Sequence, residues 1–414
     1  MTTMTAPTIR RTYPDVFDAG LPSVAYEHAG DPEEAHRLIA RARRKAPIAI
    51  GPHGPEILSY PLVRAVLRDD RFTPPKGLFL AAQGVTSGPL WDRAAANLLS
   101  LGGPAHHRLR RLVAKAFTPR AAERLRGTCV EVITELTDQC APVGACDVVA
   151  DIARRYPIPV ICALLGAPPS DWDLISRWAD DIFKMFSWNV DGNGAVIEQA
   201  GCEFDEYIEA MVAGRLFTLS DDLLSDLIRA EVDGDRLTHA ELLMLAGGVL
   251  LASTDTTRNQ LAAAVQVLCE HPAEWQLLAE HPELAPVFVE ELMRHTPIAL
   301  GTIRMAREDV ELGGVMIPAG TVVVANTAAA NRDPDIYPDP DRFDITREQP
   351  PAMLTFGGGA HYCLGSHLAR LELTQALTVL TRRWRNVRLD GPVRWKPLTG
   401  ISGPMVLPVS FDAA

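Results

Sequence analysis

The stretch Phe356-Gly357-Gly358-Gly359-Ala360-His361-Tyr362-Cys363-Leu364-Gly365 decides how the rest of the chain is interpreted. It places one cysteine at the end of a glycine-rich turn, directly before a segment, 366–383, that predicts a helix. Glycine forms tight turns and lets a backbone approach a flat ligand closely. At a helix start, unpaired amides and the helix dipole favour the thiolate, the form of cysteine that binds metals. A buried structural cysteine beside a glycine turn is the alternative reading.

This segment resembles the haem-binding loop of the cytochrome P450 family in its soluble bacterial form. Further motifs of that family follow in the right order over nearly the whole chain. The resemblance implies haem b as the cofactor, with the Cys363 thiolate as the iron ligand that favours O–O cleavage. It also implies that flat or small residues around the cysteine lie against the haem, namely Phe356, Gly357, Gly365 and Ala369.

Upstream, Glu291-Leu292-Met293-Arg294 matches the Glu-x-x-Arg motif of the family. Residues three apart on a helix share a face, so Glu291 and Arg294 can pair. A solvated surface pair is the alternative. The resemblance implies instead a buried triad, completed by an arginine from the irregular stretch before the cysteine loop. Arg342, in Pro340-Asp341-Arg342-Phe343, matches that position, and an arginine fork holds a carboxylate in fixed geometry.

Haem carries two propionates, so the resemblance also implies cations near them. His106 and Arg110 lie one helical turn apart and match the family's His-x-x-x-Arg motif. Arg304 matches another propionate contact, and His361 stands two residues before the cysteine, where the family uses Arg or His. For each residue alone, an ordinary surface cation is an equally good interpretation.

A long helix is predicted to begin at Thr238, because Thr238 and Glu241 form a capping box, and to end before His271-Pro272. Its centre resembles the oxygen-activation motif of the family, which implies proton delivery by Asp255 and Thr256, with Ala252 against the haem. The alternative for a helical threonine is a hydrogen bond to the carbonyl one turn earlier. Ser253 replaces the glycine of the family, so the width of the oxygen groove stays open.

The substrate is expected on the haem face opposite the cysteine, beneath the central helix. Small side chains leave room there, and apolar segments supply walls and a lid; the predicted pocket residues are Phe79, Leu80, Gly248, Leu251, Ala252, Ile298, Ala299 and Leu300, with 183–188 as part of the lid. Because these walls carry little charge, the substrate should be terpenoid, steroid, fatty acyl or aromatic. Alternatively, Gly248 and Ala252 only allow another helix to pack closely.

The predicted fold is mainly α, one P450 domain spanning 1–414, with small sheets near the N-terminal third and an extended arm over about 1–20. A net charge of −12 makes nucleic acid an improbable partner, and no apolar run is long enough to span a membrane. The seven scattered cysteines give no disulfide framework, and no signal peptide is recognisable, so a reduced, cytoplasmic protein is expected.

The predicted reaction is insertion of one atom of O2 into the substrate. No flavin or iron–sulfur motif occurs in the sequence, so a ferredoxin and its NAD(P)H-dependent reductase are the implied partners, docking near Arg108, Arg111 and Lys115. Two alternatives remain open. One is the same fold catalysing oxidative coupling or peroxide-driven oxidation, and the other is a haem-binding protein without turnover.

Overall fold

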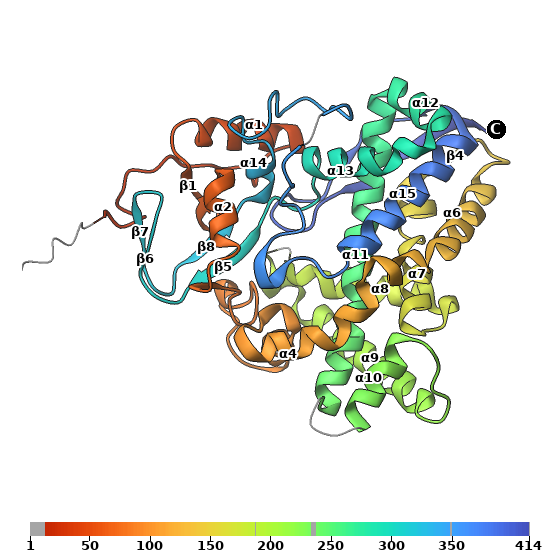
Figure 1. The fold of residues 1–414 in the computed structure, drawn as a ribbon, viewed down its shortest axis with the longest axis horizontal. Helices are drawn as coiled ribbons and strands as arrows, with labels where there is room; N and C mark the ends of the chain where they lie inside the picture. The colour runs from red at the N-terminus through yellow and green to blue at the C-terminus, as the bar shows by residue number, and fades with distance from the viewer. Residues whose placement is uncertain (1–12, 187, 233–236, 348–349, 414) are drawn as a thin grey trace, which may run out of the picture.

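The computed structural model describes residues 13–186, 188–232, 237–347 and 350–413. The largest sheet lies at one side of the molecule and most of the helices lie at the other (Figure 1). The helices are α1 (Pro32–Arg43), α2 (Tyr60–Val66), α3 (Pro89–Ala96), α4 (Gly103–Ala114), α5 (Pro119–Glu123), α6 (Arg126–Cys140), α7 (Pro157–Leu165), α8 (Trp172–Ile182), α9 (Val190–Arg215), α10 (Leu223–Val232), α11 (His239–Glu270), α12 (Pro272–Glu280), α13 (Ala285–His295), α14 (Thr327–Asn331) and α15 (Ser366–Arg383). The prediction of a helix-dominated fold is confirmed.

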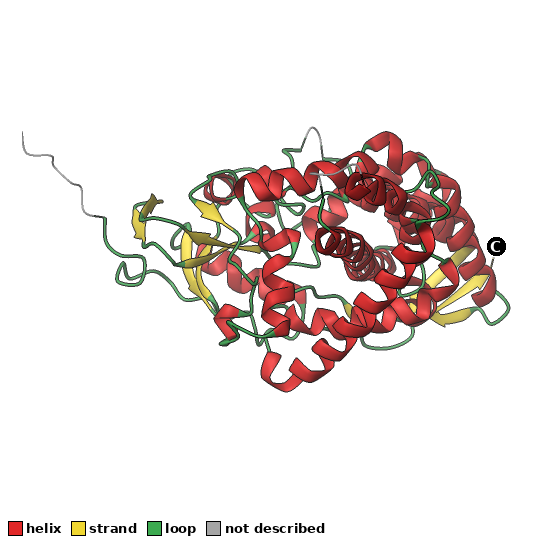
Figure 2. Cartoon of the chain, turned by 90° about the horizontal axis from the view of Figure 1, so that it is seen from below, coloured by secondary structure: helices red, strands yellow, loops and turns green. Residues whose placement is uncertain are grey.

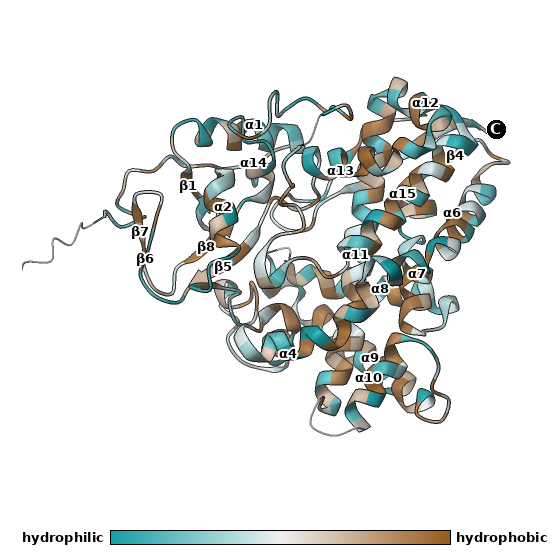
Figure 3. Ribbon diagram, viewed as in Figure 1, coloured by the Kyte–Doolittle hydropathy of each residue, from teal (hydrophilic) through white to brown (hydrophobic). Residues whose placement is uncertain are grey.

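The central helix, α11, is the longest, and its predicted ends are confirmed. The Thr238 hydroxyl accepts a hydrogen bond from the Glu241 amide at 3.3 Å, and the Glu241 carboxylate accepts one from the Thr238 amide at 2.9 Å. Helix α11 packs against α7, α8, α9 and α15, and it is seen nearly end-on among the surrounding helices in Figure 2. Its apolar stretches, brown in Figure 3, lie in the main hydrophobic core.

The strands form four small sheets. The largest has the order β1-β2-β8-β5-β3, and the others pair β4, β12 and β9, β6 with β7, and β10 with β11. The bounds are β1 (Ile48–Gly51), β2 (Gly54–Ile57), β3 (Phe72–Thr73), β4 (Ala145–Asp147), β5 (Thr302–Ala306), β6 (Val310–Leu312), β7 (Val315–Ile317), β8 (Val322–Ala325), β9 (Trp384–Leu389), β10 (Arg394–Trp395), β11 (Pro404–Val406) and β12 (Pro408–Ala413).

The prediction that the sheets lie near the N-terminal third holds for β1, β2 and β3 of the largest sheet, whereas the other strands come from later in the chain. The N-terminal hairpin β1–β2 pairs in parallel with β8, where Glu56 faces Val324, and β8 pairs with β5, where Val323 faces Arg304. Such pairing joins segments far apart in the chain, which a local pattern cannot reveal. Part of the predicted N-terminal arm, 1–12, lies outside the described residues, and Asp15 forms a bridge with Met316 of β7.

No helix in the described ranges is both long enough and apolar enough to cross a lipid bilayer.

Candidate active site

The cysteine loop is fixed by backbone contacts. The Cys363 amide donates to the Phe356 carbonyl at 2.8 Å, which closes the loop, and Gly357 turns it with φ = 72°. Gly359 has φ = 63°, and a Cβ built on it would lie 2.3 Å from the Leu67 carbonyl oxygen. Gly359 therefore allows the loop to pack closely against the end of α2. The sequence had instead suggested that the glycines of this loop let it approach a flat ligand.

The Cys363 side chain is reached by solvent and yet surrounded by protein atoms. Cys363 is exposed by its accessible surface, yet burial among surrounding protein atoms raises the pKa of the thiol. Hydrogen bonding from the Gly365 amide and the positive charges of Arg110 and Arg370 act in the opposite direction and lower the pKa of this thiol. This surrounding of donors and cations favours the thiolate once a metal binds.

Four basic side chains from three segments gather beside this loop. Arg304 of β5 is 5% exposed and bonds only neutral groups, Thr302 Oγ1 at 3.1 Å and the Ile303 carbonyl at 2.8 Å. Burial lowers its pKa to about 10. The rings of His106 and His361 lie 4.0 Å apart, and burial lowers their pKa values to about 4 and about 3. The charges of Arg304 and Arg110 lower the pKa of His361 further.

Within the described part of the chain, no carboxylate forms an ion pair with the buried Arg304. Nδ1 of His106 is buried and has no hydrogen-bond partner. A buried cation is costly unless it is paired, and two carboxylates delivered by a ligand would supply the missing charge. The four predicted residues do converge, and their chemistry fits a dianionic group.

Helix α11 carries an open stripe on a mostly buried surface. Met244, Gly248 and Thr256 are partly exposed and Ala252 is exposed, whereas most of their neighbours from Leu242 to Leu268 are buried. Positions four apart share a helix face. A Cβ built on Gly248 meets no atom within 4 Å, whereas one on Gly247 would lie 2.9 Å from Phe204. Gly248 therefore borders open space, and the alternative that it serves close helix packing applies to Gly247 instead.

Asp255 and Thr256, the acid and the alcohol at the centre of α11, contact different neighbours. The Thr256 hydroxyl donates to the Ala252 carbonyl at 3.0 Å, the bond expected of a helical threonine. Asp255 is 3% exposed and bonds Nε of Arg258 at 2.7 Å, with Nζ of Lys396 at 3.6 Å. Arg258 in turn reaches Asp180 of α8 at 2.6 Å. Helix α11 runs unbroken through Ser253.

Arg258 and Lys396 were missed in the sequence. The spacing of Asp255 and Arg258, three apart on a helix, was the available signal for the first. Lys396 comes from a distant strand segment, and no local pattern marks it.

The predicted lid is an aromatic cluster. The Phe79 ring meets Phe186 at 5.6 Å and Trp188 at 5.3 Å, both edge-on, and Trp188 stacks on His53 at 3.5 Å. The Gln83 side chain holds this segment at both ends, since its oxygen accepts from the Val190 amide at 3.1 Å and its nitrogen donates to the Met185 carbonyl at 3.4 Å.

Two of the predicted pocket residues point elsewhere. Leu80 is 0% exposed and packs with Leu90, Ala94, Val190 and Ile197. Leu300 is 6% exposed and joins the small core beneath α1. Their assignment to the pocket is wrong. An apolar side chain in such a segment can face either a core or a cavity, and its sequence does not tell which. Among the remaining wall residues, Leu251 and Ala299 are partly exposed and Ile298 is buried, with 8% of its surface exposed.

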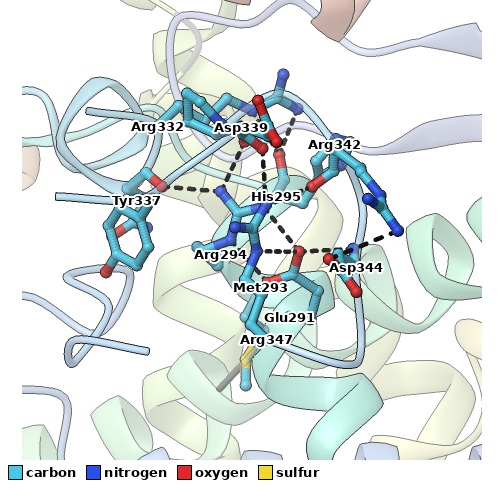
Figure 4. Close-up of polar contacts among 12 residues, drawn as sticks. Glu291, Met293, Arg294, His295, Arg332, Tyr337, Asp339, Arg342, Asp344 and Arg347 are labelled. Carbon is cyan, nitrogen blue, oxygen red and sulfur yellow. Dashed lines mark hydrogen bonds and ion pairs between the residues drawn. The ribbon is translucent and has the colours of Figure 1, made fainter. Parts of the chain in front are cut away.

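The buried triad exists, but its third member differs from the prediction (Figure 4). Arg294 donates to both carboxylate oxygens of Glu291, at 2.7 and 2.8 Å. The other arginine on Glu291 is Arg347, whose Nε lies 3.1 Å from Oε1. Arg342 is wrong as the partner: its side chain is 68% exposed and lies 3.7 Å from Asp344, and only its carbonyl accepts from Arg294, at 3.1 Å. Both arginines lie in irregular chain, where no periodicity tells which one turns inward.

Of the three cations predicted to lie where a ferredoxin docks, Arg111 and Lys115 are exposed. Arg111 lies near the end of α4 and Lys115 directly follows it. Arg108 instead forms an ion pair with Glu241 at the start of α11.

Comparisons with known proteins agree with this geometry. Residues 273–394 match the model of the family described as Cytochrome P450. The mycinamicin IV hydroxylase/epoxidase of Micromonospora griseorubida is 41% identical over 86% of this chain and 90% of that protein. The chain belongs to the cytochrome P450 family. The luteothin monooxygenase of Streptomyces thioluteus is 37% identical over 91% of this P450 and 93% of that protein.

The fold agrees as well. The structure of the P450 enzyme CxnD, described as acting in C–S bond formation in chuangxinmycin biosynthesis, superposes with a TM-score of 0.84 at 31% identity, over 94% of this chain and 97% of that one. This P450 is therefore a haem-dependent oxidoreductase that inserts oxygen into an organic substrate. A cysteine directly before α15, beside Arg110 and near the buried Arg304, fits that cofactor.

Proposed function

We propose that this P450 is a monooxygenase in which Cys363 is the axial thiolate and a small, mainly apolar substrate lies beneath α11. The observation that carries the proposal is the open stripe on α11, where Ala252 is exposed in the middle of a buried helix. When bound, haem supplies the reductive activation of O2. His106, Arg110, Arg304 and His361 would hold its propionates, and Phe356, Gly357, Gly365 and Ala369 would lie against it.

Asp255 and Thr256 would move protons toward the oxygen side of this site. Asp255 is poised between the interior and α8, because Arg258 links it to Asp180, which is about one-third exposed at its side chain. The Asp255 carboxylate can therefore take a proton from the outer side and release it inward. Thr256 holds its hydroxyl at the Ala252 carbonyl and can present Oγ1 to a water in the open stripe. General acid–base steps of this kind contribute typically 10² to 10⁴ in rate.

The substrate class is argued from the walls. Gly248, Ala252 and Ala299 leave space, and Phe79, Phe186 and Trp188 provide an aromatic cover. Such walls recognise area rather than charge, which favours a terpenoid, steroid, fatty acyl or aromatic skeleton. The relatives named as a mycinamicin hydroxylase/epoxidase and a luteothin monooxygenase support oxidation of a bulky organic product.

Electrons would come from a ferredoxin with its NAD(P)H-dependent reductase, in the cytoplasm. A ferredoxin with an acidic surface would bind near Arg111 and Lys115, which are both exposed. They lie close in the chain to Arg110 of α4, whose side chain bonds the Tyr362 carbonyl of the cysteine loop. Complementary charges of this kind speed association and lose their effect at high salt.

The test is Cys363→Ser. The variant should lose the thiolate absorption band of the reduced carbon monoxide complex and all product formation. Comparing product formed with O2 and reductant against product formed with peroxide alone then separates a monooxygenase from a peroxide user, while a product with a new bond and no added oxygen indicates oxidative coupling. An unchanged thiolate band in Cys363→Ser would refute the ligand assignment.

A further inference from the structure

Arg370 of α15 contacts two residues of the loop that precede the cysteine, Phe356 and Tyr362. Its guanidinium carbon lies 4.5 Å from the centre of the Phe356 ring, and its Nη1 lies 3.5 Å from the Tyr362 hydroxyl. Phe356 accepts the Cys363 amide through its carbonyl, and Tyr362 directly precedes Cys363. Arg370 therefore contacts the residue directly before Cys363 and the residue whose carbonyl accepts the Cys363 amide.

The charge of Arg370 acts on the thiol as well. Like Arg110, whose side chain bonds the Tyr362 carbonyl, Arg370 is a cation held against the residue directly before Cys363. The Arg370 side chain is only 29% exposed, so water screens its charge incompletely. Groups of this kind around a metal ligand set the reduction potential of the metal.

Arg370 has a counter-charge on the outer side. Glu290 of α13 binds Nε of Arg370 through Oε1 and lies 3.1 Å from Nη2 through Oε2. The Glu290 side chain is 44% exposed. Arg370 contacts Phe356 and Tyr362 of the loop, and the more exposed Glu290 binds Arg370, so the arginine carries the charge that is held directly against the loop.

We propose that Arg370 is a positioning residue that sets the reduction potential of the haem iron, and that Glu290 offsets part of its charge. A cation beside the thiolate draws electron density from the sulfur, which favours the reduced iron and so the one-electron transfer from a reduced ferredoxin to the ferric haem. The proposal rests on the proposed role of Cys363 as the ligand.

The test measures the midpoint potential of the holoenzyme and three variants by spectroelectrochemistry. Arg370→Gln removes the cation and leaves Glu290 unpaired, so the ratio of reduced to oxidised iron at a fixed potential should fall about tenfold, equivalent to 59 mV for one electron. Glu290→Gln should shift the potential the other way by a smaller amount. Arg370→Lys keeps the charge and should stay near wild type. The double variant should lie between Arg370→Gln and wild type.

The thiolate band of the reduced carbon monoxide complex is recorded for every protein. If the wild type lacks that band, the role of Cys363 is wrong, whatever the potentials are. If the band is present and Arg370→Gln keeps the wild-type potential, the proposal is overturned. It is also overturned if Glu290→Gln and Arg370→Gln shift the potential in the same direction, because a disturbed loop, not a charge, would then be the cause. Should Arg370→Gln fail to fold, the opposite shift of Glu290→Gln alone still decides.

Discussion

The two sides of the proposed haem site are built differently. On the cysteine side, the backbone is held at many points: Gly359 packs on the Leu67 carbonyl, and Cys363 bonds Phe356. On the oxygen side, the site is defined by what is missing, since Gly248 and Ala252 leave space along α11. A ligand that must not move is held by contacts, whereas a substrate site needs volume, and the side chains around it are free to differ.

The largest effect is expected at the triad that supports the cysteine side. Glu291→Ala strands Arg294 and Arg347, and removal of one partner from a buried charge pair costs about 3–5 kcal/mol. Most of the variant should therefore be haem-free or insoluble, measured by haem content per protein and by thermal unfolding. Arg347→Ala should behave in the same direction.

Arg342→Ala is the matched control. Its side chain is exposed, and only its carbonyl serves the triad, so its haem content should equal that of the wild type. Haem loss in Arg342→Ala with a normal Arg347→Ala would reverse the assignment of the third member.

The cysteine side was also the more predictable one. The limits of α15 follow from local residues, so they were predicted well. Glu291 and Arg294 pair across one helical turn, which spacing alone reveals. The third arginine was missed because Arg342 and Arg347 lie in irregular chain, where the turn that buries one of them depends on distant carbonyls such as those of Pro338 and Asp339.

On the oxygen side, single residues were predicted less well. Leu80 and Leu300 have the right chemistry for a pocket wall but point into small cores. Asp255 was found from its motif, yet its partner Lys396 arrives from a remote segment. Positions that depend on non-local packing carry no periodic signal, so the sequence alone does not predict which way these side chains point.

The next largest effect is expected at Asp255. Asp255→Asn removes the acid while keeping the size of the side chain, and turnover should fall about 10² to 10⁴-fold, with haem content and ligand binding retained. Steady-state rates with saturating reductant measure this. Asp180→Asn, the outer neighbour of Arg258, is the control and should reduce turnover far less. Equal losses in both variants would mean that the Arg258 ion pairs act only by holding α8 to α11.

Glu372 joins the two sides of the site, because it links α15 to α11. It lies on α15, is 1% exposed, and bonds the Thr257 hydroxyl of α11 at 3.3 Å. Burial raises its pKa to about 8. The folded protein therefore keeps this proton between about pH 4.5 and 8, where the unfolded chain has lost it, so stability falls as pH rises through that window.

Glu372→Gln should remove that slope. The variant should match the wild type near pH 5 and exceed it by about 1–4 kcal/mol at pH 9, since one pKa unit corresponds to about 1.4 kcal/mol. Urea unfolding at several pH values measures the difference. Glu135→Gln, on the exposed face of α6, should leave the pH profile unchanged. Parallel profiles for wild type and Glu372→Gln would show that this carboxyl titrates alike in both states.

The smallest effect on stability is expected at two neighbouring glycines of α11, Gly247 and Gly248. Their variants also give the most direct test of the oxygen side. A Cβ at Gly247 would lie 2.9 Å from Phe204, so Gly247→Ala forces a packed interface apart and should cost about 1–3 kcal/mol. Gly248 has no atom within 4 Å of its Cβ position, so Gly248→Ala should stabilise the helix by up to about 1 kcal/mol. Gly248→Phe should fold and bind haem, yet bulky apolar ligands should no longer displace water from the iron, seen in the haem absorption shift. If Gly248→Phe binds those ligands as the wild type does, the open stripe is not the substrate site. If it fails to fold while Gly247→Ala is tolerated, the two glycines have the opposite roles, and the volume above the cysteine must be bounded by other residues.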